Sequence, residues 1–133
     1  AIDSYPIDED RMCLYGASYG GYAALMTAVR APDSYNCAIG YVGIYDLNYA
    51  YTESDTMKAM GGEAYLNMAI GTNKEQLNEF SPVNHVDKIK ANVMLIHGEK
   101  DSRVPVINAD TMLKRFQSAG KKVPYLNFSN SDH

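Results

Sequence analysis

The chain has 133 residues, 46% of them hydrophobic and 21% charged, which is enough for one domain with a core but short for an enzyme built on a wide sheet. Its 16 acidic and 12 basic residues give a formal net charge of -4, and no basic cluster is longer than Lys121-Lys122. We therefore expect no nucleic-acid partner and no membrane partner, the latter also because no apolar run approaches the roughly 20 residues of a membrane span.

Cysteine and histidine usage gives no sign of a disulfide framework or a metal site. Cys13 and Cys37 each lie in an apolar segment, where a free buried thiol is the commoner state, so we expect two free thiols. The three histidines are far apart, and neither C-x-x-C nor H-x-x-x-H spacing is present. We expect no metal and no cofactor.

The first part of the chain has the pattern strand, helix, strand. A short apolar segment at 11–15 predicts a strand, and residues 19–30 predict a helix that ends at Ala31-Pro32-Asp33, because proline cannot continue it. Residues 37–42 are short and apolar throughout, which is typical of a strand buried on both faces of a parallel sheet.

Residues 45–80 are predicted to leave the sheet. Glycine breaks and weak helical periodicity, around 55–60, 63–69 and 74–80, indicate loops and short helices of the kind that cover an active site.

The rest of the chain returns to the alternating pattern. It predicts a strand at 92–97, an amphipathic helix at 106–119 that ends at Gly120, and a strand at 123–128. Strands that alternate with helices predict an α/β fold with a parallel sheet and right-handed crossovers.

The segment from Gly16 to Gly20 has the pattern G-x-S-x-G between a predicted strand and a predicted helix, which is the context of a nucleophile elbow. Ser18 would then lie at the tip of a strained turn, with glycines where side chains at Gly16 and Gly20 would collide. The backbone N–H of Tyr19, at the helix start, would face a developing oxyanion. The alternative is an ordinary glycine-rich turn.

Two more reactive side chains follow strands. In a parallel sheet, the loops after the strands meet at one edge, so Ser18, Asp101 and His133 are predicted to converge there. They supply a nucleophile, an orienting carboxylate and a base. Their order in the chain, Ser, Asp, His, is the order found in hydrolases that carry a nucleophile elbow. Alternatively, Asp101 is a turn carboxylate and His133 a frayed end. His97 and His85 are interpreted as structural and surface residues, respectively.

Three segments together resemble the catalytic α/β-hydrolase domain of the prolyl oligopeptidase family of serine peptidases: GASYGGY at Gly16–Tyr22, SPVNH at Ser81–His85 and HGEKDSRVP at His97–Pro105. Within that family the chain is most similar to bacterial dipeptidyl-peptidase and acylaminoacyl-peptidase-like members. The resemblance implies Ser18 as nucleophile, Asp101 as orienting acid and His133 as general base.

The resemblance also implies substrate-binding residues. Arg103 matches an arginine that holds a substrate carbonyl, and Val104 matches the pocket for the residue before the cleaved bond. The same assignment is made for Tyr22, Val42 and Tyr45.

The implied function is a serine peptidase that cleaves short peptides through an acyl-enzyme. A carboxylic-ester hydrolase with the same triad and a non-catalytic binding module are the alternatives.

The resemblance implies that residues 1–133 are the C-terminal part of a hydrolase domain, with about four parallel strands and flanking helices. The family's upstream strands, its N-terminal β-propeller and an upstream tyrosine that supplies a second oxyanion donor have no counterpart in these residues. The strand at 11–15 would then be an open edge, and we expect the segment alone to be weakly active or inactive, and either marginally folded or associated with another chain through that edge.

Overall fold

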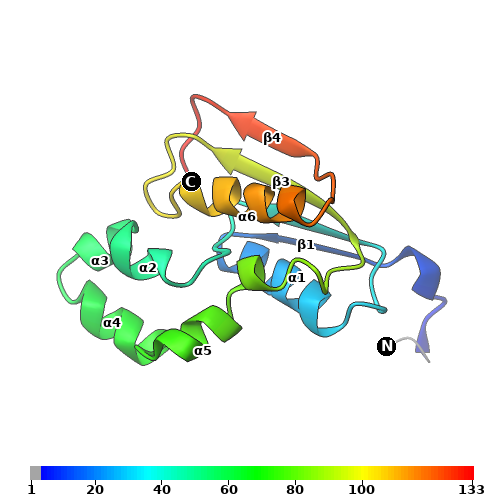
Figure 1. Cartoon of the computed structure of the whole chain (residues 1–133), viewed down its shortest axis with the longest axis horizontal. Helices are drawn as coiled ribbons and strands as arrows, with labels where there is room; N and C mark the ends of the chain where they lie inside the picture. The colour runs from blue at the N-terminus through cyan, green and yellow to red at the C-terminus, as the bar shows by residue number, and fades with distance from the viewer. Residues whose placement is uncertain (1–3) are drawn as a thin grey trace.

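The computed structural model describes residues 4–133 as a parallel sheet with helices on one face (Figure 1). The strand order is β1-β2-β3-β4. The strands are β1 (Cys13–Ala17), β2 (Cys37–Tyr41), β3 (Asn92–Gly98) and β4 (Tyr125–Phe128). The first strand begins two residues later than predicted because Glu9–Arg11 form a 3-10 turn, η2, capped by Asp8.

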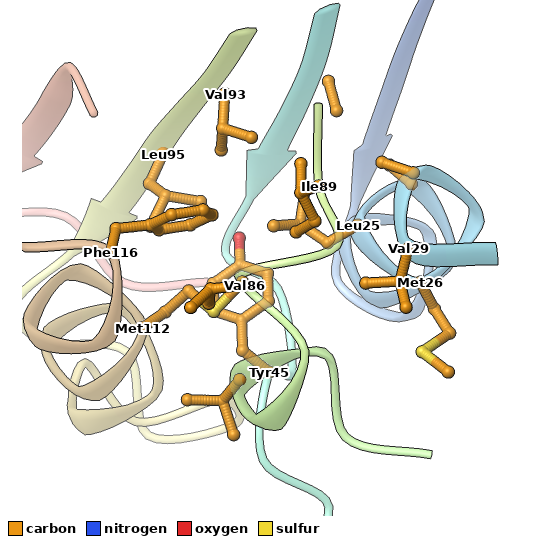
Figure 2. Packing of buried hydrophobic residues seen from close by; sticks show 14 of the residues in the cluster. Leu25, Met26, Val29, Tyr45, Val86, Ile89, Val93, Leu95, Met112 and Phe116 are labelled. Carbon is orange, nitrogen blue, oxygen red and sulfur yellow. The ribbon is translucent and has the colours of Figure 1, made fainter. Parts of the chain in front are cut away.

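The helices α1 (Tyr19–Arg30) and α6 (Ile107–Ser118) cover the same face of the sheet, and the 3-10 turn η3 (Pro82–Asn84) contacts both. The predicted amphipathic character of α6 is confirmed, since Ala109, Met112 and Phe116 are fully buried and Leu113 is partly buried against the same core. They join Leu25 of α1 and the inward residues of the strands in the core that Figure 2 shows. No helix within residues 4–133 is long and apolar enough to cross a bilayer.

The opposite face of the sheet is not covered by the described residues. Burial alternates along β1 and β2, and three large side chains on this face are exposed: Tyr15, Leu126 and Phe128. The prediction of strands buried on both faces is therefore wrong within the described part of the chain, because both long helices pack on one side.

The predicted excursion from the sheet is present and extends to one side of it (Figure 1). It contains α2 (Tyr49–Thr52), which was not predicted, and α3 (Asp55–Lys58), α4 (Gly62–Ala69) and α5 (Lys74–Glu79), which were. The buried Ser81 hydroxyl joins its two ends: it accepts from Leu47 N at 2.9 Å and donates to Leu77 O at 2.6 Å. The excursion is therefore anchored where it leaves the sheet and where it returns.

Cys13 and Cys37 form a disulfide, so the prediction of two free thiols is wrong. The reason is the strand register, which the sequence does not display. The two residues are direct partners in adjacent parallel strands, their Cα atoms are 4.6 Å apart, and both side chains lie on the face that the helices leave open. This Cα distance is within the range that a disulfide requires.

Candidate active site

Ser18 lies at the turn between β1 and α1. Its backbone has φ 56° and ψ -121°, a conformation that residues other than glycine rarely adopt. The turn is held by Ser18 N, which donates to Tyr41 O of β2 at 2.9 Å, and by Ser18 O, which accepts from Gly21 N at 3.0 Å. The strained geometry of a nucleophile elbow is thus fixed by bonds to the neighbouring strand and to the first turn of the helix.

Two glycines make this turn sterically feasible. A Cβ at Gly16 would overlap the Gly20 carbonyl, and a Cβ at Gly21 would lie 2.8 Å from Gly43 Cα. A Cβ at Gly20 would meet nothing within 4 Å, so the expectation that Gly20 is crowded is wrong. At Gly20 it is the carbonyl, and not the side-chain position, that approaches the strand.

Asp101 follows β3 in a tight turn and is 4% exposed. Its Oδ1 accepts hydrogen bonds from the backbone N–H groups of Arg103 at 3.0 Å and Val104 at 2.8 Å. These two bonds fix the carboxylate, so that Oδ2 faces the last residue of the chain.

His133 connects Asp101 to Ser18. Its Nδ1 is 2.8 Å from Asp101 Oδ2, and its Nε2 is 2.9 Å from Ser18 Oγ. Because an ionised carboxylate only accepts, Nδ1 carries the proton and Nε2 is free to accept from the hydroxyl. The loop that carries His133 packs against β3 at Gly98, where a Cβ would lie 2.8 Å from the Asp132 carbonyl oxygen and overlap that of Ser131.

The three residues that the sequence predicted to converge therefore form one hydrogen-bonded chain at the carboxyl edge of the sheet. Beside it, Tyr19 N–H is the first amide of α1 and has no acceptor within the helix. It is available to a negative oxygen near Ser18, and the helix dipole favours such a charge there.

A cavity of about 510 Å³ adjoins Ser18, between the excursion and residues 103–105, which follow Asp101. Tyr22, Arg103 and Val104, three of the residues that the resemblance assigns to substrate binding, are among those that line it. The only charged residue among those that line it is Arg103, whose side chain is 67% exposed and whose Nε is 3.9 Å from Asp55 Oδ2. Burial raises the pKa of Tyr22 above its ordinary value, which keeps its phenol neutral.

Tyr45 and Val42 do not line this cavity, and their assignment to substrate binding is corrected. Tyr45 is fully buried in the core, where its ring is directed toward the sheet (Figure 2) and a Cβ at Gly40 would overlap its hydroxyl. The missing side chain of Gly40 makes the space that Tyr45 fills. Val42, 3% exposed, bonds through its N–H to Ile96 O at 2.8 Å.

Much of the cavity wall comes from the excursion, which the sequence predicted to cover this edge of the sheet without identifying the individual lining residues: Leu47, Tyr49, Tyr65, Leu66 and Ile70. The spacing of Leu66 and Ile70 predicts that both lie on one face of a short helix. That spacing does not say what the face packs against.

The other two histidines are not in the hydrogen-bonded chain. His85 Nε2 is 2.7 Å from Glu79 O, and His97 is completely buried with Nε2 2.7 Å from Val104 O. Burial lowers the pKa of His97, although the Val104 carbonyl and the Asp101 charge oppose this.

Comparison with known proteins gives a family match that spans the chain. The model of the prolyl oligopeptidase family matches residues 1–133. Dipeptidyl aminopeptidase BIII of Pseudoxanthomonas mexicana is 29% identical over 94% of this chain, and the acylamino-acid-releasing enzyme of Arabidopsis thaliana is 26% identical over 100% of it. The structure of an acylaminoacyl peptidase from Pyrococcus horikoshii covers 99% of the chain with a TM-score of 0.89 and 26% identity.

The matched region is a small part of each of these proteins. The chain covers 19% of the Pseudoxanthomonas enzyme, 18% of the Arabidopsis enzyme and 21% of the Pyrococcus chain. The comparisons establish the α/β-hydrolase fold of the segment that carries the site.

Proposed function

Because the chain belongs to the prolyl oligopeptidase family, we propose that the protein is a serine peptidase that uses Ser18, His133 and Asp101. The observation that carries the proposal is the continuous chain of hydrogen bonds from Ser18 Oγ through the His133 ring to the Asp101 carboxylate, at 2.9 and 2.8 Å. A serine hydroxyl is a weak nucleophile without such a base, and the base needs a carboxylate to hold its tautomer.

The geometry supports a two-step acyl transfer. His133 Nε2 takes the hydroxyl proton while Ser18 Oγ bonds to the peptide carbonyl carbon, and the same nitrogen then gives the proton to the leaving amine as the C–N bond breaks. Water, deprotonated by His133, next attacks the carbonyl carbon of the acyl-enzyme, and His133 returns the proton to Ser18 Oγ as the bond between Ser18 Oγ and the acyl carbon breaks and the acid leaves. Asp101 stabilises the positive ring in both steps, and Tyr19 N–H stabilises the tetrahedral oxyanion.

The cavity supports an assignment for the substrate side chain. Apolar residues predominate in its wall, and it contains no acidic residue that would select a lysine or arginine side chain. We expect an apolar side chain at the residue whose carbonyl is attacked, with the exposed Arg103 guanidinium donating to a substrate carbonyl at the rim. The volume of about 510 Å³ is within the range of ligand pockets.

Short peptides are the proposed substrates because a dipeptidyl aminopeptidase and an acylamino-acid-releasing enzyme are among the relatives. The test is a panel of dipeptidyl and acylaminoacyl anilides, with matched esters, given to the complete gene product. Cleavage of apolar anilides, abolished by Ser18→Ala, is the expected result. Ester hydrolysis without any amide cleavage would identify an esterase instead.

A fluorophosphonate probe separates both enzymes from a non-catalytic module. The intact protein should be labelled at Ser18, and the Ser18→Ala variant should not. An unlabelled wild-type protein that is folded would refute the proposal.

A further inference from the structure

His97 is a buried polar residue with no role in the mechanism above. It lies near the end of β3, completely buried, with its side chain on the face of the sheet that the helices cover. Its Nε2 is 2.7 Å from the carbonyl oxygen of Val104, seven residues later, and 3.7 Å from Asp101 Oδ2. Its Nδ1 has no hydrogen-bond partner within the described residues.

The contact with Val104 determines the tautomer. A carbonyl oxygen only accepts, so the proton of the neutral ring must be on Nε2. The N–H that points at Val104 also places its positive end near the Asp101 carboxylate, which reinforces the orientation of that group.

The same residue, Val104, is bonded from both sides. Its carbonyl accepts from His97, and its N–H donates to Asp101 Oδ1 at 2.8 Å. Asp101 Oδ2 in turn meets His133 Nδ1 at 2.8 Å. The turn 101–104, which directs the Asp101 carboxylate at His133, is thus linked to β3 by one side-chain hydrogen bond, from His97 to the Val104 carbonyl. This bond is additional to the backbone connection between the strand and the turn.

We infer that His97 is a positioning residue for the triad: its Nε2–H holds the Val104 carbonyl, and through this bond the turn 101–104 keeps Asp101 directed at His133. The inference rests on the proposed serine-peptidase function. The charged or titratable groups that act on His97 are Asp101, His133 and, from α6, Asp110. Burial lowers the pKa of His97 more than the carboxylates of Asp101 and Asp110 raise it. His97 therefore stays neutral and keeps its Nε2–H directed at the Val104 carbonyl.

Three substitutions in the complete gene product test the role. Glutamine can place an amide N–H near the position of Nε2, asparagine reaches only the position of Nδ1, and leucine fills the space without a donor. We measure the rate at which a fluorophosphonate labels Ser18 and the pH dependence of kcat/KM on an apolar anilide.

In His97→Leu and His97→Asn, we expect labelling to slow by about 10²-fold, the typical consequence of a misplacement of about 1 Å. The acidic limb of the rate profile should move to lower pH, because a displaced Asp101 no longer stabilises the protonated His133 ring. His97→Gln should retain the wild-type limb and most of the labelling rate. A loss of folded protein alone would lower the rate without moving the limb.

The inference is overturned if all three variants lose the same activity while their limbs stay in place, or if all three retain wild-type activity. If the leucine and asparagine variants do not fold, the glutamine variant decides: a retained limb supports the role, and a moved limb overturns it. Failure of the proposed function itself is distinguishable, because the wild-type protein would then not be labelled at Ser18.

Discussion

Replacing Gly16 by alanine tests the steric account of the elbow. The added Cβ would overlap the carbonyl carbon and oxygen of Gly20 and would lie 2.9 Å from its Cα, so every atom it meets belongs to the backbone. No change of rotamer relieves such an overlap. Either the first turn of α1 must move away from β1, or the turn at Ser18 must open.

The expected cost is at or above the upper end of the range for inserting an extra carbon into a packed core, about 3 kcal/mol. A shift of about 1 Å at Ser18 Oγ would also break its 2.9 Å contact with His133 Nε2 and slow the reaction by about 10²-fold. Both losses have the same cause, so they should occur together.

Gly20→Ala is the matched control. It adds the same carbon four residues later, where nothing lies within 4 Å, and it places alanine in a helix, a change worth up to about 1 kcal/mol of added stability. Urea unfolding and fluorophosphonate labelling of the two variants, each in the complete gene product, measure the two effects. A Gly16→Ala protein as stable and as reactive as the wild type, or a Gly20→Ala protein equally damaged, would refute this reasoning.

Three further predictions concern other parts of the chain. Reduction of the Cys13–Cys37 disulfide, which joins residues 24 apart in sequence, should lower the free energy of unfolding by about 3–4 kcal/mol; two titratable thiols in the native, unreduced protein would contradict the pairing. Because burial lowers the pKa of His97, the unfolded chain takes up its proton first as the pH falls below about 6.5. The stability from this group is therefore present above that pH and lost as the pH falls through the lowered value. Between pH 8 and 5, the free energy of unfolding should fall less in His97→Gln than in the wild type. Equal falls in the two proteins would contradict a lowered pKa of His97 in the folded state. Residues 1–133 expressed alone should self-associate through the edge of β1 and react slowly with the fluorophosphonate probe. A protein that sediments as a monomer and is labelled at the full rate would show that the edge of β1 neither drives association nor impairs the site.

The sequence was sufficient for features that depend on strand ends and on local spacing. The convergence of Ser18, Asp101 and His133 follows from one rule, that loops after parallel strands share an edge, and needs no knowledge of side-chain packing. The buried face of α6 follows from its period in the same way. Both rest on residues whose neighbours are set by topology alone.

Features that depend on approach between distant segments were not accessible in this way. Gly21 is crowded by Gly43 and not by a neighbour in sequence, and Tyr45 is in the core because Gly40 leaves space for its ring. The pairing of Cys13 with Cys37 likewise requires the register of β1 on β2. A slip of one residue would have placed the two sulfur atoms on opposite faces of the sheet.

The disulfide also has a consequence for the position of Ser18. β1 pairs in parallel with β2, with Cys13 opposite Cys37 and Ala17 opposite Tyr41. Here the β1–β2 pair is fastened at one end by Cys13–Cys37 and at the other by Ser18 N on Tyr41 O. Sliding by one residue would move Ser18 by about 3.3 Å along the strand, more than its whole 2.9 Å separation from His133 Nε2. The covalent link at the far end of the strand pair therefore fixes the register of β1 on β2, and through this register it also fixes how far Ser18 Oγ lies from His133 Nε2.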